Sequence, residues 1–250
     1  MLFFLLRPGR LISLALLVAI GLAGLWAWRR ARASPPATLS AALEAVRHAP
    51  PPPPGVPLGG VYRLRLHGTE RIGIGPARLS RTLPGGALEV VTGTTTGQRV
   101  LELRLSADEA ESWTVDAGGR TASARSLTVG LSWFSHTFSG ATKPPLPLLP
   151  ASFRTRAWRA TYVAADVAFD RRSRIVASRP LKVDGATYTG FLVEATETAT
   201  GALSGTEITR GWYVPRLGLF TSLKIDRRYD GVIVDRLSAT LGLVSATPTR

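Results

Sequence analysis

The 250-residue chain contains no cysteine and only three histidines. The lack of cysteine excludes disulfide bonds, cysteine-based metal sites and a lipid-modified amino-terminal cysteine. His48, His67 and His136 are far apart in the sequence, without the i, i+4 spacing or the clustered acids that a metal site needs. We therefore expect neither a metal nor another cofactor.

Recognisable catalytic motifs are also absent. The sequence has no G-x-S-x-G elbow, P-loop or zinc-protease motif, and Gly73-x-Gly75 lacks the third glycine of a dinucleotide fingerprint. The closest group of acids, Asp108, Glu109 and Glu111, is typical of a solvated turn. We therefore predict that the protein is not an enzyme.

Lysine is scarce, since only three of the 31 basic residues are lysine, while the acids number 17 and the net charge is +14. Such an excess attracts nucleic acid, anionic lipid head groups or acidic polymers, but arginine throughout a chain is as typical of codon bias as of phosphate binding. Residues 154–159 are simply explained as a strand whose arginines face water, and residues 171–174 as a charged hairpin tip or as charges that protect a sheet edge. We expect no nucleic-acid partner, and keep a lipid or an anionic envelope polymer as partners.

The longest uncharged run covers residues 11–28. Eighteen helical residues rise by roughly 27 Å, close to the hydrocarbon thickness of a bilayer. This predicts a transmembrane anchor within residues 1–33. The alternative is a cleaved secretory signal with residues 31–33 as the cleavage site, but the length of the run and the interfacial Trp26 and Trp28 favour the anchor. The flanking arginines are Arg7, Arg10, Arg29, Arg30 and Arg32.

The orientation of this anchor follows less directly from charge, because the two flanks carry similar numbers of arginines. Long domains cross a membrane largely regardless of local charge. The proline-rich segment after the anchor is typical of an envelope spacer. We therefore predict a single-pass protein of the bacterial cytoplasmic membrane with its body outside the cytoplasm.

Residues 34–58 form the predicted neck between anchor and body. Leu39, Leu43 and Val46 recur at helical spacing, which predicts one short amphipathic helix near the membrane surface. The proline run at residues 50–54 favours polyproline II and predicts a stiff spacer.

From residue 59 to residue 250 the hydrophobic period is near two, which predicts a single β-rich domain. Tyr62, Leu64 and Leu66 alternate with polar residues, as expected for an antiparallel sheet with one buried face. Asp184-Gly185 and Asp230-Gly231 predict hairpin turns. The same alternation recurs at Leu101, Leu103 and Leu105, at Leu127, Val129, Leu131 and Trp133, and in residues 159–169, 186–196, 206–214, 219–225 and 231–241.

One short motif resembles a known family. Trp212-Tyr213-x-Pro215-x-x-Gly218-Leu219 is similar to a segment of bacterial envelope proteins of unknown function, whose curved antiparallel sheet resembles that of the lipoprotein carrier LolA and related lipid-binding proteins. The resemblance implies a mainly β fold, a curved antiparallel sheet or open half-barrel, here preceded by one N-terminal transmembrane helix. A tethered chain without a lipid-attachment cysteine departs from the carriers, because it cannot shuttle cargo freely.

These features together predict a membrane-anchored, extracytoplasmic, non-catalytic binding module for an apolar or amphiphilic, lipid-like ligand. Arginines near the site would meet an anionic head group. The alternative is a structural or assembly subunit of an envelope complex with a protein partner. A binding module needs a cavity of at least roughly 300 Å³, whereas an assembly subunit has a filled core and an apolar outer patch. The aromatic residues predicted to line or rim the ligand site are Trp113, Trp133, Trp158, Phe191, Trp212 and Tyr213.

Overall fold

The computed structural model describes residues 34–74, 77–131 and 134–250. Within these residues no helix has the length and apolar character needed to cross a bilayer. The anchor predicted within residues 1–33 and the aromatic site residue Trp133 lie outside the described residues.

The described chain is mainly β, with one short helix, α2 (Leu39–His48). The strands are β1 (Gly60–Ile74), β2 (Ala77–Thr82), β3 (Gly86–Gly93), β4 (Arg99–Arg104), β5 (Ala110–Val115), β6 (Thr121–Leu131), β7 (Phe134–Pro147), β8 (Ala157–Ala164), β9 (Val167–Val183), β10 (Ala186–Gly201), β11 (Leu203–Val214), β12 (Leu219–Gly231) and β13 (Val234–Leu243).

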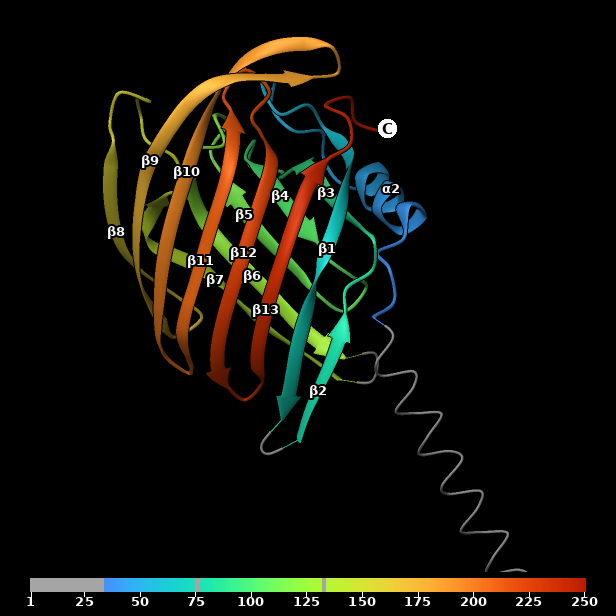
Figure 1. Ribbon diagram of the computed structural model, residues 1–250, viewed down its shortest axis with the longest axis vertical. Coiled ribbons are helices and arrows are strands. Elements are labelled where there is room, and N and C mark those ends of the chain that lie inside the picture. The colour runs from blue at the N-terminus through green and yellow to red at the C-terminus, as the bar shows by residue number, and fades with distance from the viewer. Residues whose placement is uncertain (1–33, 75–76, 132–133) are drawn as a thin grey trace, which may run out of the picture.

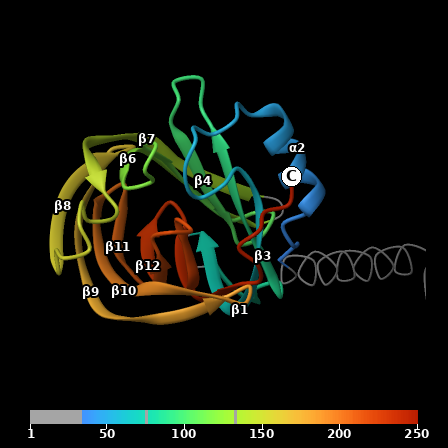
Figure 2. The same ribbon diagram turned by 90° about the horizontal axis from the view of Figure 1, so that it is seen from above.

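The strands form one antiparallel sheet that closes on itself (Figures 1 and 2). From β3 to β13 they pair in sequence order, and β1 pairs with both β3 and β13, so twelve strands make a barrel and β2 is a branch on β1. The predicted mainly β class is confirmed, but the predicted open half-barrel is wrong. The reason is the length of β1, whose 15 residues pair first with β3 and then with β13, which closes the sheet.

The predicted alternation fixes which side chains point inward. Tyr62, Leu64 and Leu66 are buried in the barrel, while the residues between them face outward. The run predicted at residues 159–169 is instead divided between β8 and β9 by a turn at Ala165 and Asp166, both with positive φ. This turn has no glycine, so the usual sequence signal for a hairpin is missing.

The short helix predicted in the neck is present and packs on the outside of the barrel. Its apolar side chains contact Val61, Leu88 and Val90, which is why both faces of β3 are buried there. The proline run that follows lies against the barrel rather than extending from it, because the Gly93 N–H donates to the carbonyl oxygen of Pro50 at 2.8 Å.

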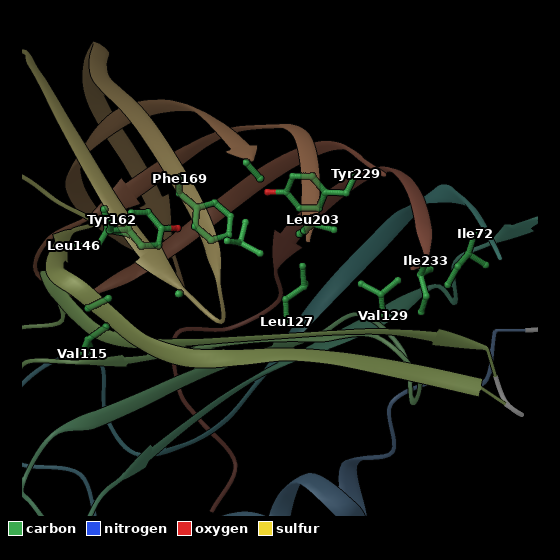
Figure 3. Packing of buried hydrophobic residues seen from close by; sticks show 14 of the residues in the cluster. Ile72, Val115, Leu127, Val129, Leu146, Tyr162, Phe169, Leu203, Tyr229 and Ile233 are labelled. Carbon is green, nitrogen blue, oxygen red and sulfur yellow. The ribbon is translucent and has the colours of Figure 1, made fainter. Parts of the chain in front are cut away.

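The largest apolar cluster in the barrel is shown in Figure 3. Phe169, Leu203 and Tyr229 on one wall face Leu127 and Val129 on the opposite wall. These side chains fill the end of the barrel that is bounded by the β8–β9, β10–β11 and β12–β13 turns. The other end is less completely filled and contains a cavity.

Arg99 holds the proline run on the barrel. Its side chain is fully buried, and its guanidinium donates to the carbonyl oxygens of Ala117 at 2.8 Å and Pro53 at 2.6 Å, and also to that of Pro57. Hydrogen bonds from a charged donor contribute about 1.5–3 kcal/mol each. Arg99 therefore makes the neck part of the folded body.

We predict that Arg99→Met releases residues 50–57 and lowers the free energy of unfolding by at least about 3 kcal/mol, because three carbonyl oxygens lose their charged donor. Limited trypsin digestion should then cut faster at the exposed Arg47. Arg63→Met, on the outer face of β1, is the control and should leave both measurements unchanged. Equal digestion of the two variants would contradict this role.

Candidate functional site

A layer of buried charged residues crosses the middle of the barrel. Strand register places Arg171, Glu197, Glu207 and Arg227 side by side on β9, β10, β11 and β12. On β12 the inward positions around this level are apolar, with Ile225 on one side and Tyr229 on the other. The charged layer therefore separates the two apolar ends of the barrel.

Ion pairs in this layer connect opposite walls. From β6, Arg125 reaches across to Glu197 on β10 at 2.5 Å, and it also contacts Glu111 on its own side at 2.8 Å. From β12, Arg227 reaches across to Glu111 at 3.0 Å while binding its neighbour Glu207 at 2.6 Å. Arg125 and Arg227 thus share the carboxylate of Glu111, and they join strands that are far apart in the sequence.

Buried carboxyl groups outnumber the arginines of this layer. Arg227 also contacts Glu109 at 3.2 Å and Asp235 at 3.3 Å, and Arg81 pairs with Glu70 at 2.5 Å. Burial, with the neighbouring carboxylates of Glu70 and Asp235, raises the pKa of Glu109 well above its usual value. A raised pKa favours the protonated, neutral form of this carboxyl group.

The pKa values show which acids the layer stabilises as anions. Burial alone would raise the pKa of Glu197, but Arg125 and Arg171 outweigh it and lower that pKa to about 2. Burial raises the pKa of Asp235 to about 7, because Arg227, which it shares with three other acids, offsets only part of the desolvation. Glu197 is thus a permanent anion, while Asp235 binds a proton near neutral pH.

Two interpretations of the sequence are corrected by this layer. Glu109 and Glu111 are not in a solvated turn, since they point into the barrel and Glu109 is only 1% exposed. Arg171 is not at a hairpin tip, because it lies inside β9 and contacts Glu197 at 3.3 Å. The sequence signal for this layer is the alternation along β12. Arg227 follows Ile225 by two positions, so both side chains point to the inner face of the strand.

A cavity of about 170 Å³ lies inside the barrel, on the other side of the charged layer from Phe169, Leu203 and Tyr229. Three of the lining segments are connections between strands, at Gly119, Leu148–Leu149 and Gly218, so the cavity reaches the end of the barrel. Its wall is largely apolar. The strand residues that line it are Leu64, Glu89, Leu101, Leu103, Glu111, Trp113, Arg171, Val193, Glu207, Thr209, Gly211, Tyr213, Phe220, Ser222, Leu223, Ile225, Leu241 and Leu243.

Four charged side chains line this cavity, and three of them belong to the ionic layer. Glu111 and Glu207 are held by Arg227, and Arg171 is held by Glu197. Glu89 on β3 is different, because no hydrogen bond or ion pair joins its carboxyl group to any of the described residues. Burial raises the pKa of Glu89 to about 7.

Two of the six aromatic residues predicted to form the ligand site line the cavity. Trp113 comes from β5 and Tyr213 from β11, so the fold brings them to one space from opposite walls. Burial raises the pKa of Tyr213 to about 12, so its hydroxyl is neutral and can donate a hydrogen bond. Contact of these rings with a ligand stays a prediction.

The other described members of that group lie outside the cavity lining. Trp158 packs against the apolar cluster around Tyr213, and Phe191 stacks on Phe153 with ring centroids 4.5 Å apart. Trp212 has the guanidinium of Arg179 over its ring at 4.3 Å. The aliphatic lining and Glu89 do not follow from the sequence, since alternation identifies inward positions but not where space is left between them.

Comparison with known proteins adds little to this geometry. No family model and no curated protein sequence matches the chain. Among solved structures, the chain is similar to the crystal structure of a DUF1329 family protein from Desulfovibrio piger, with 10% sequence identity and a TM-score of 0.17 over 82% of this chain and 88% of that chain. A TM-score this low supports no argument about fold or function.

We predict that Arg227→Met destabilises the barrel by at least about 3–5 kcal/mol, because several buried carboxyl groups lose their shared cation. The matched control is Arg228→Met at the next position on β12, whose side chain points outward and whose loss should change stability by less than about 0.5 kcal/mol. Chemical denaturation of the full chain measures both. Similar values for the two variants would exclude a structural role for the ionic layer.

We also predict that Asp235→Asn stabilises the protein at alkaline pH. With a pKa of about 7, the folded state holds a proton that the unfolded chain releases near pH 4, so this group lowers stability as pH rises from about 4 to 7. Asparagine removes this loss. The advantage of the variant in melting temperature should grow from pH 5 to pH 8.5; a constant difference across this range would refute the raised pKa.

Proposed function

We propose that the protein is a non-catalytic binding module of the bacterial envelope, and that its ligand is a small apolar or amphiphilic molecule held in the barrel. The observation that carries this proposal is the cavity beside the charged layer, with its largely apolar wall. Protein interiors are close-packed, so unfilled space of this kind sacrifices packing energy. A ligand that fills the space restores those contacts.

The size of the cavity limits the ligand. At about 170 Å³ it is smaller than the roughly 300 Å³ expected of a binding module, so that expectation is not met and the ligand must be smaller. An apolar protein cavity of about 150 Å³ binds benzene, so this one accommodates about six to eight non-hydrogen atoms. The ligand is therefore a small molecule, or a longer amphiphile of which only one end enters the barrel.

The assembly subunit is less well supported. It requires an apolar outer patch, but the exposed large hydrophobic residues come from separate elements, as Val163 on β8 and Ile208 on β11 illustrate. Strand register places Thr196 and Asp226 beside Ile208, so this side chain has polar neighbours. Single exposed hydrophobic residues are normal on a protein surface.

The charge on the outer surface supports an anionic lipid or envelope polymer as a partner. Outside the first 33 residues the chain has 26 basic and 17 acidic residues. Eight of the acids but only five of the arginines lie inside the barrel or against it, which leaves 21 basic and nine acidic residues on the outside. The interior residues are Glu70, Glu89, Asp108, Glu109, Glu111, Glu197, Glu207, Asp235, Arg81, Arg99, Arg125, Arg171 and Arg227.

The resemblance to LolA-like envelope proteins, drawn from Trp212-Tyr213-x-Pro215-x-x-Gly218-Leu219, is consistent with a ligand held against the inner face of a sheet. In this chain the sheet is closed, so the ligand lies within the barrel rather than on an open concave face. A membrane anchor in residues 11–28 and a body outside the cytoplasm complete the proposal.

We predict that the full chain, held in lipid nanodiscs, binds the neutral probes benzyl alcohol and 1-hexanol saturably. Leu103→Trp fills the cavity and should abolish binding, whereas Leu103→Ala enlarges it and should retain binding. Ligand-observed NMR, with empty nanodiscs as the partition control, measures the difference, and circular dichroism checks that both variants fold. Equal signals from the original chain and the Leu103→Trp variant would refute a binding cavity.

A further inference from the structure

Glu89 occupies an unusual place in the cavity wall. It lies on β3 in register with Tyr62 on β1 and Leu103 on β4, and all three side chains point inward. The Tyr62 hydroxyl donates to the carbonyl oxygen of Leu58 at 2.9 Å, so it is already engaged. Leu64 and Leu101 extend the apolar wall on either side. The carboxyl group of Glu89 therefore faces the cavity.

The other carboxyl groups at this cavity have partners from the charged layer. Glu111 lies 2.8 Å from Arg125, and Glu207 lies 2.6 Å from Arg227. No arginine among the described residues reaches Glu89. A carboxyl group without a partner in an apolar wall destabilises the fold, and a leucine at this position would not. A partner that enters the cavity would remove this penalty.

The charge of the cavity indicates the sign of that partner. Arg171 is the one guanidinium among the described lining residues, and Glu197 binds it at 3.3 Å. Three carboxyl groups line the same space, and Glu89 is the one without a cation. An anionic head group, as predicted from the arginine-rich sequence, would meet carboxylates here rather than free arginines. A cationic group that also donates hydrogen bonds meets the complementary charge.

We propose that Glu89 is the polar recognition group of the cavity and that the ligand is a small amine, whose ammonium group binds the Glu89 carboxylate while its apolar part lies against Leu64, Leu101 and Leu103. This inference rests on the proposed function, since it specifies the chemistry of the ligand in the same cavity. The ammonium group donates up to three hydrogen bonds, and the neutral hydroxyl of Tyr213 lies in the same lining.

The test compares three probes that share one ring and differ in the charge of the head group: benzylamine, benzyl alcohol and benzoate. Titration calorimetry uses the full chain in nanodiscs, with empty nanodiscs as the partition control. Benzylamine should bind about 10- to 100-fold more tightly than benzyl alcohol, as expected for a charge-assisted hydrogen bond, and benzoate should bind most weakly.

Two substitutions locate the effect. Glu89→Gln keeps the shape of the side chain and should weaken benzylamine binding about 10- to 100-fold, while benzyl alcohol binding changes less than about twofold. Glu102→Gln on the neighbouring strand β4 is the matched control, because it removes the same charge from a side chain paired with Arg104 outside the cavity lining, and it should change neither affinity.

The outcomes separate this inference from the function on which it rests. If benzyl alcohol binds but benzylamine binds no more tightly, or if Glu89→Gln leaves benzylamine binding intact, the amine is refuted and the binding module remains. Tightest binding of benzoate refutes the amine in the same way. If none of the probes binds and Leu103→Trp changes nothing, both proposals are overturned.

Discussion

The ion pairs that join the two walls of the barrel are the constraint on which the rest of the structure depends. Arg125 reaches from β6 to Glu197 on β10, and Arg227 reaches from β12 to Glu111 on β5. Because removal of either arginine leaves carboxyl groups buried without a cation, the spacing between the walls is set at this level by charge as well as by side-chain volume. Apolar side chains fill one end of the barrel, while at the other end a cavity remains above the charged layer.

The same layer determines how charge is divided between the inside and the outside of the protein. Its carboxyl groups exceed its arginines, and burial with the neighbouring carboxylates raises the pKa of Glu109 well above its usual value, which favours its neutral form. Acids held inside no longer balance arginines outside. The outer surface is therefore more basic than the net charge of the chain indicates, a property that depends on the folded arrangement as well as on composition.

Sequence periodicity predicts the strands well and the closed barrel poorly. The inward phase of Tyr62, Leu64 and Leu66 follows from local alternation, but the pairing of β1 with β13 joins the two ends of the sheet and leaves no local pattern. The β8–β9 turn was missed because Ala165 and Asp166 adopt positive φ without a glycine. Of the six aromatic residues predicted for the ligand site, Trp113 and Tyr213 line the cavity. The charged layer was missed because hydrophobic patterning assigns charged residues to the solvent, although Arg227 is in phase with its apolar neighbours on β12.

Glu89 shows where the pairing of inward charges ends. At the level of Glu197 and Glu207 each carboxylate meets an arginine, Glu197 from the opposite wall and Glu207 from the neighbouring strand. At the level of Glu89 the space between the walls is the cavity itself, and the lining leucines Leu64, Leu101 and Leu103 offer no donor. The unsatisfied group and the unfilled space therefore occur together. A void and an unpartnered carboxyl group each lower stability, and one ligand with an apolar body and a cationic end relieves both.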